Sequence, residues 1–158
     1  MNSYFSPQKN FLYFVGLLPK EIRCGITTRY FDCCNYYHTD KAPQEQNIKK
    51  LASVFGAKKV IAPLPEQGTN IIVADPLEKK WLQQKNGDAI ILNTDDWKNQ
   101  KPMLIFPTGD CPIIILYDDH SWTLIHCGWR GIRGGIIAKT IEELRLFRLK
   151  KKEAKVII

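Results

Sequence analysis

The 158-residue sequence lacks a hydrophobic run long enough to cross a bilayer, and it has no pair of cysteines at C-x-x-C spacing. Its apolar run "FLYFVGLL", residues 11–18, is followed by "PKEIRC", which does not resemble a secretory cleavage site. The five cysteines are odd in number, a pattern typical of reduced thiols. We therefore expect a cytoplasmic protein without a membrane segment.

The net charge of +7 is not distributed as in a nucleic-acid-binding protein. Residues 145–158 hold six basic side chains and one acidic one, so this short segment carries +5 of the +7. A basic run at the end of a helix is usually solvated, and no recognition module accompanies this one. We expect no nucleic-acid partner, and the length predicts a single domain over residues 1–158.

Short runs rich in branched and aromatic residues predict strands, and two segments have helical periodicity. The polar turn "YDDHSW" predicts that the last two strands form an antiparallel hairpin. In the last helix, Ile137, Ile141 and Leu144 should form the buried stripe. The pattern predicts an α+β fold of mixed α/β layers, with a largely antiparallel or mixed sheet flanked by helices. The predicted strands are 11–17, 59–63, 70–74, 89–93, 103–106, 112–117 and 122–126, and the helices are 46–56, 134–147 and, more weakly, 76–84.

A cysteine and a histidine stand at opposite ends of the predicted hairpin sequence. Antiparallel pairing should bring Cys111 and His126 together at one end of the sheet. Asp110 precedes the cysteine, and Trp129 and Arg130 follow the histidine, so we expect a polar, electropositive setting that favours a thiolate. The alternative is an ordinary buried cysteine beside a satisfied core histidine.

A glycine-rich loop, "GWRGIRGG" at residues 128–135, leads directly into the last predicted helix. Backbone N–H groups at a helix start and guanidinium forks can together bind an anion, most naturally phosphate. In the alternative interpretation the glycines only make a tight turn and the arginines are solvated.

The pieces "TGDC" at 108–111 and "HCGWRG" at 126–131 together resemble the paired signature of the laccase-domain family, also called multicopper polyphenol oxidoreductases. Weaker matches are "GITTR" at 25–29, Asn47 at the start of a helix, and "GDAIILNTD" at 87–95. The resemblance extends over residues 11–158. It implies a layered fold similar to the catalytic domain of cytotoxic necrotizing toxins.

The resemblance implies a purine nucleoside phosphorylase that uses adenosine, inosine or methylthioadenosine, and adenosine deamination is also ascribed to the family. A zinc ion would be held by two histidines and a cysteine, two of which would here be Cys111 and His126. Copper is less favoured, because one cysteine and one histidine are too few for a multicopper cluster. A homo-oligomer is expected, because family sites are thought to lie near subunit contacts. The other candidates are Asp110 for catalysis and Arg29, Arg130, Asn47 and Trp129 for binding substrate or phosphate.

This sequence departs from the family pattern at two places. Gln67 stands where the family has its first zinc-binding histidine, and the chain ends at "KVII" where family members continue. Two alternatives therefore stay open: a metal-free Cys–His hydrolase or deamidase, and an inactive, truncated family member. A second half-site, Cys33 or Cys34 with His38, is a weaker metal candidate. His120, in the hairpin turn, should lie far from Cys111 and His126.

Overall fold

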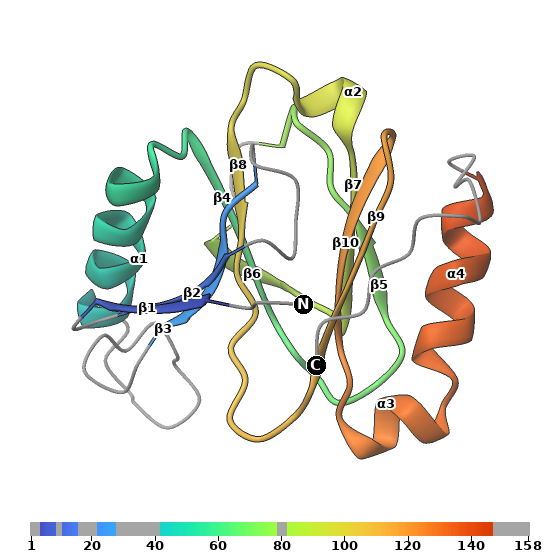
Figure 1. Ribbon diagram of the computed structural model, residues 1–158. Coiled ribbons are helices and arrows are strands. Elements are labelled where there is room, and N and C mark those ends of the chain that lie inside the picture. The colour runs from blue at the N-terminus through green and yellow to red at the C-terminus, as the bar shows by residue number, and fades with distance from the viewer. Residues whose placement is uncertain (1–3, 9–10, 16–21, 28–41, 79–81, 147–158) are drawn as a thin grey trace. The chain divides into compact units, whose positions relative to one another are not determined.

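The computed structural model describes residues 4–8, 11–15, 22–27, 42–78 and 82–146 (Figure 1). The chain divides into two compact units, Met1–Leu51 and Ala52–Ile158, which are described separately. The expectation of one domain over residues 1–158 stays a prediction. None of the helices in the described ranges is long and apolar enough to span a bilayer.

The first unit contains an antiparallel sheet in the order β1-β2-β3. Helix α1, Ala42–Phe55, begins in this unit, and its last turn belongs to the second. It starts four residues before the predicted segment of 46–56. Ile48 and Leu51 are buried, as their spacing predicts, and Gly56 ends the helix with a φ of +64°. The three strands are β1, Tyr4–Gln8; β2, Phe11–Val15; and β3, Cys24–Thr27.

The described residues of the second unit form two sheets and three helices, apart from the last turn of α1. The larger sheet has the order β5-β7-β10-β9, in which β5 is parallel to β7 and the other pairs are antiparallel. The smaller sheet, β6-β4-β8, is parallel. The predicted α+β class with mixed sheets is therefore confirmed. The elements are β4, Lys59–Leu64; β5, Ile71–Val73; β6, Leu82–Asn86; β7, Ala89–Asn93; α2, Thr94–Trp97; β8, Pro102–Leu104; β9, Ile113–Tyr117; β10, Ser121–His126; α3, Trp129–Arg133; and α4, Ile136–Leu146.

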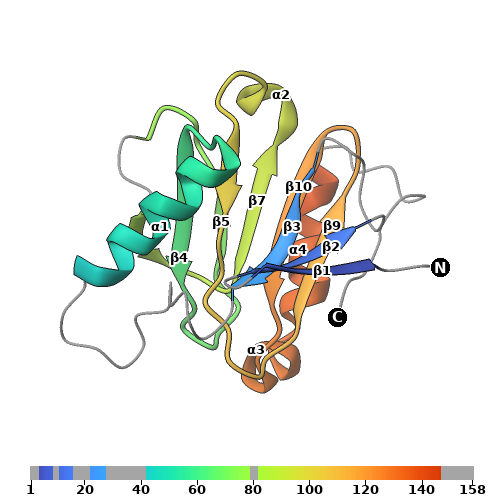
Figure 2. The same cartoon turned by 60° about the vertical axis from the view of Figure 1, so that its left-hand side comes forward.

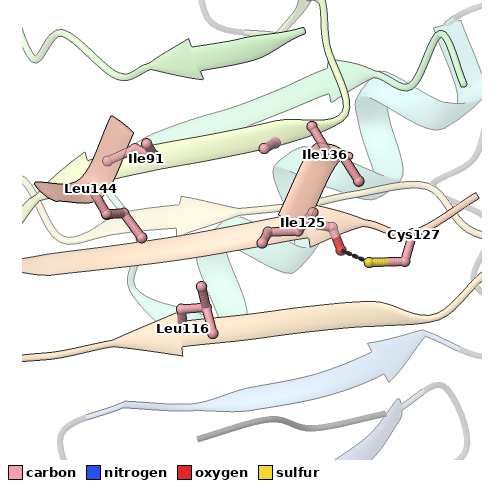
Figure 3. Close-up of a cluster of buried hydrophobic side chains, with 7 residues drawn as sticks. Ile91, Leu116, Ile125, Cys127, Ile136 and Leu144 are labelled. Carbon is pink, nitrogen blue, oxygen red and sulfur yellow. Dashed lines mark hydrogen bonds between the residues drawn. The ribbon is translucent and has the colours of Figure 1, made fainter. Parts of the chain in front are cut away.

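Strand β7 is buried on both faces, because successive side chains enter different hydrophobic clusters. Ile90 packs in a cluster with Ile61 of β4, whereas Ile91 packs with Ile136 and Leu144 of α4. Figure 3 shows the second cluster, and Figure 1 shows α4 and the smaller sheet on opposite sides of the larger one. The result is a three-layer arrangement that leaves the ends of β7 and β10 to carry polar groups.

Two of the predicted elements need correction. The helix predicted at 76–84 is wrong, because Pro76 lies in a turn in which the Asp75 side chain accepts a hydrogen bond from the Leu77 amide at 2.8 Å. The chain then pairs with β4 as strand β6, so a tertiary ladder overrides the helical pattern. The strand predicted at 103–106 spans Pro102–Leu104.

The buried stripe of α4 is rotated by one residue from the predicted one. Ile136, Thr140 and Leu144 are fully buried, whereas Ile141 is 38% exposed. The sequence pattern did not predict a buried Thr140, because the stripe was assigned from apolar residues only. Its hydroxyl donates to the Ile136 carbonyl at 2.7 Å, which allows it to be buried without an unpaired donor.

Candidate functional site

The β9–β10 hairpin brings Cys111 and His126 to one place. His126 pairs with Ile113, and the Cys127 amide donates to the Pro112 carbonyl at 2.9 Å, which continues the pairing toward Cys111. A Cβ atom at Gly128 would lie 3.2 Å from His126 Cε1 and 3.8 Å from Cys111 Sγ. The side chains of Cys111 and His126, the two candidate residues, therefore both lie next to Gly128.

A buried carboxylate that the sequence interpretation missed, Asp88, orients His126. Asp88 precedes β7 directly opposite His126, whose amide donates to the Asp88 carbonyl at 2.7 Å. Asp88 Oδ1 lies 3.0 Å from His126 Nδ1, and both side chains are almost fully buried. A carboxylate can only accept here, so the neutral imidazole carries its proton on Nδ1. Nε2 is then the ring nitrogen left for chemistry.

Asp88 also fixes the loop that contains Gln67. Its two carboxylate oxygens accept hydrogen bonds from the Gln67 amide at 3.0 Å and the Gly68 amide at 2.8 Å. Gln67 has a φ of +56°, a left-handed conformation that is uncommon for a residue other than glycine. These bonds satisfy the buried charge and hold the strained turn in place.

Residues of helices α3 and α4 also contact the loop that contains Gln67. A Cβ at Gly131 of α3 would lie 2.7 Å from the Gly68 carbonyl oxygen, so only glycine permits this close approach. The Lys139 ammonium of α4 donates to the Thr69 hydroxyl at 2.8 Å. Figure 2 shows α3 at the end of the larger sheet. The loop is consequently held by Asp88, which precedes β7, and by residues of α3 and α4.

The Arg130 side chain joins the glycine-rich segment to Gln67. Its Nη1 donates to Gln67 Oε1 at 2.6 Å, and its guanidinium carbon lies 4.5 Å from the centre of the Trp129 ring. Arg130 is exposed, and Trp129 is 62% exposed. Gln67, Trp129 and Arg130 thus form one surface group beside the Asp88–His126 pair.

The electrostatic setting of Cys111 is the reverse of the predicted one. Burial raises the pKa of the Cys111 thiol, and the negative charge of Asp110 together with its hydrogen bond to the thiol raises it further. The thiol donates to Asp110 Oδ1 at 3.7 Å, whereas the Arg130 guanidinium is held by Gln67. The expectation that this environment favours a thiolate is therefore wrong for the metal-free protein.

Several predicted residues are not among the described residues of the second unit that build this site. Arg29, Cys33, Cys34 and His38 fall outside the described residues. Asn47 belongs to α1 in the first unit, whereas the site is built from the second unit alone. His120 lies in the turn between β9 and β10, at the opposite end of the hairpin from His126, as expected.

A zinc ion of the kind the resemblance implies finds only part of a site. Cys111 Sγ and His126 Nε2 are donors that zinc prefers, and a carboxylate behind a histidine is common in such sites. Across the described ranges, however, no three His, Cys, Asp or Glu side chains gather where they could hold a metal. The Gln67 amide oxygen is already bonded to Arg130. Two donors fall short of the three that a catalytic zinc takes, so the residues that the structure describes do not fit a complete site.

The sequence model of the family described as multi-copper polyphenol oxidoreductase laccase matches residues 22–158. The chain belongs to this family.

Two curated relatives bear the name purine nucleoside phosphorylase. The relative from Aquifex aeolicus is 33% identical over 98 residues, which are 62% of this chain and 44% of the relative. The relative from Clostridium acetobutylicum is 30% identical over 101 residues, 63% of this chain and 39% of the relative. The matched segments thus span less than half of either relative.

Solved structures share the fold. YlmD from Geobacillus stearothermophilus superposes with a TM-score of 0.71 at 16% identity, over 91% of this chain and 59% of that one. A Neisseria meningitidis protein gives a TM-score of 0.69 at 21% identity, over 87% and 58% of the two chains. At such identities the likeness shows the fold alone.

The Asp88 carboxylate yields a first prediction. In Asp88→Asn, one backbone amide faces an amide nitrogen, and a buried donor without a partner costs about 1–3 kcal/mol. We expect the free energy of unfolding in urea to fall by about that amount. In Asp88→Leu, which removes both acceptor oxygens, the nitrogen shifts of His126 in NMR should show loss of the tautomer protonated on Nδ1. Asp96→Asn and Asp96→Leu, on the exposed side of α2, are the controls and should change neither property. Retention of the tautomer in Asp88→Leu would contradict the orienting role.

Proposed function

We propose that the site cleaves purine nucleosides with phosphate, with adenosine, inosine and methylthioadenosine as candidate substrates. The observation that carries the proposal is the Asp88–His126 pair beside the Gln67–Arg130 group, which sets a proton-transfer residue next to a guanidinium. The two curated relatives named purine nucleoside phosphorylase support it. Asp110 keeps its predicted role as a catalytic candidate through its contact with Cys111.

The chemistry can be written with the residues that are present. An oxygen of the phosphate dianion forms a bond to C1′ of the ribose while the bond from C1′ to the purine nitrogen breaks. The bonding electron pair leaves with the base, which needs a proton. A protonated His126 delivers it from Nε2, and the Asp88 carboxylate stabilises the imidazolium before the transfer. The Arg130 guanidinium neutralises charge on the phosphate. Ribose 1-phosphate and the free base are the products.

Loss of the proton donor tests this mechanism. We expect His126→Gln to lower kcat by roughly 100-fold or more, since general acid catalysis contributes about that much. Base release and ribose 1-phosphate formation from adenosine, inosine and methylthioadenosine would be followed by chromatography. His120→Gln, at the other end of the hairpin, is the matched control and should keep its activity. Absence of phosphate-dependent base release from the wild-type protein would refute the proposal. Inosine formed from adenosine without phosphate would instead show the deaminase activity.

Zinc binding at Cys111 and His126 is a separate part of the proposal. With two donors the ion should bind weakly, so we expect up to one zinc per chain after equilibration, removable by dialysis against a chelator. Cys111→Ala should abolish this binding, and Gln67→His should strengthen it by adding a third donor. Mass spectrometry of metal content after graded dialysis measures both effects. Equal zinc content in the wild-type protein and Cys111→Ala would exclude the site, and a parallel titration with Cu²⁺ tests the less favoured metal.

A metal-free Cys–His hydrolase or deamidase is the second candidate, favoured by one observation. Asp88 orients His126 as the acid of a catalytic triad orients its base. The raised pKa of Cys111 weighs against it, because less thiolate is then present at neutral pH.

Alkylation distinguishes the two candidates. At pH 7.5 we expect iodoacetamide to label Cys111 more slowly than it labels glutathione, with Cys111 identified by peptide mass mapping. Asp110→Asn should accelerate labelling, because removing the negative charge lowers the pKa of the thiol and increases the thiolate fraction below that pKa. A wild-type Cys111 that reacts faster than glutathione would favour the hydrolase.

A further inference from the structure

The Gln67 side chain accepts a hydrogen bond from Arg130, a residue 63 positions away near the start of the glycine-rich segment. The acceptor is a neutral amide, so it orients the Arg130 guanidinium without cancelling its charge. Within the described part of the chain, no ion pair includes Arg130. Gln67 therefore holds the positive charge in place, and no described carboxylate neutralises it.

Two contacts fix the plane of the guanidinium. Gln67 Oε1 accepts from Nη1 at 2.6 Å, and the Trp129 ring lies 4.5 Å from the guanidinium carbon. A guanidinium carries five N–H donors in a rigid fork. One donor is used by Gln67, and the remaining N–H groups match the oxygens of a tetrahedral anion.

The position of Gln67 is itself determined before any ligand arrives. Its amide is bonded to Asp88, its backbone has a φ of +56°, and α3 packs against the next residue, Gly68. The side chain therefore starts from a fixed backbone, which reduces the entropy lost when it holds Arg130 in one orientation.

From these contacts we infer that Gln67 is a positioning residue that holds Arg130 as a binding fork for an oxyanion, which is inorganic phosphate if the proposed phosphorolysis is correct. The inference rests on the proposed function for the identity of the anion alone. A cation bound at Gln67 Oε1 would be repelled by the adjacent guanidinium, so the side chain serves anion binding and not metal binding. In this inference, glutamine at position 67 serves to orient Arg130 and is not only the replacement of a zinc ligand.

Direct measurement of phosphate binding tests this role. The dissociation constant of inorganic phosphate would be measured by calorimetry for the wild-type protein, Gln67→Met, Gln67→Glu and Arg130→Lys. We expect Gln67→Met and Arg130→Lys each to weaken binding by roughly tenfold, the equivalent of one hydrogen bond. Gln67→Glu should weaken it at least as much, because its carboxylate pairs with Arg130 and repels phosphate. Gln100→Met and Gln100→Glu, in the turn after α2, are matched controls and should leave the constant unchanged.

A double variant separates positioning from a structural role. If Gln67 acts through Arg130, adding Gln67→Met to Arg130→Lys should weaken phosphate binding no further than Arg130→Lys alone. The thermal midpoint should stay near that of the wild type, and Gln67→Glu keeps the acceptor in case Gln67→Met does not fold. Additive effects, or constants within twofold of the wild type for both Gln67 variants, would overturn the inference.

The phosphate-binding experiment does not depend on catalytic turnover. If phosphate binds the wild-type protein and binds the Gln67 variants about tenfold more weakly, but the wild-type protein releases no purine base, the fork stands and the phosphorylase is refuted. Base release by a wild-type protein that shows no saturable phosphate binding would overturn the fork and leave nucleoside cleavage standing.

Discussion

The buried carboxylate of Asp88 is the interaction on which the candidate site depends. A carboxylate removed from water is costly unless donors surround it, and here the donors are two backbone amides and an imidazole. They come from the Gln67 loop and from β10, while Asp88 itself precedes β7. One charge therefore joins three segments that are distant in the sequence. It also sets the tautomer of His126 and the starting point of the Gln67 side chain.

The sequence predicts those parts of the site that depend on local pairing. The turn "YDDHSW" implies the β9–β10 hairpin, and the hairpin brings Cys111 and His126 together. Asp88 was missed because β7 and β10 are not consecutive strands, so their register cannot be derived from a turn. The letters "GDA" before a buried strand were a usable signal, since a carboxylate at the start of such a strand needs partners. The thiolate expectation was wrong because burial of the Cys111 thiol and then the neighbouring Asp110 carboxylate both raise its pKa. The sequence does not show that burial, nor that the Arg130 guanidinium is bonded to Gln67.

Gln67 is the position at which the family pattern and the contacts seen in this chain suggest different roles. The resemblance treats the residue as a lost zinc ligand, and within the described ranges the two remaining donors, Cys111 and His126, do not complete a catalytic zinc site. The contact with Arg130 gives the same position a different use, because a neutral acceptor can orient a cation that stays available to an anion. The weak zinc binding and the organised anion binding that we propose would both follow from this one side chain.

The last residue of β10, His126, and the residue after it, Cys127, connect the site to the core. His126 faces Asp88, whereas Cys127 lies in the hydrophobic cluster with Ile136 of α4 (Figure 3). A slip of one residue in strand register would exchange the faces, placing an imidazole among aliphatic side chains and a thiol opposite the carboxylate. Such a chain would lose core stability and chemistry together. Correct packing of β10 in the second unit therefore also places His126 against Asp88. A folded core and an assembled Asp88–His126 pair require the same strand register.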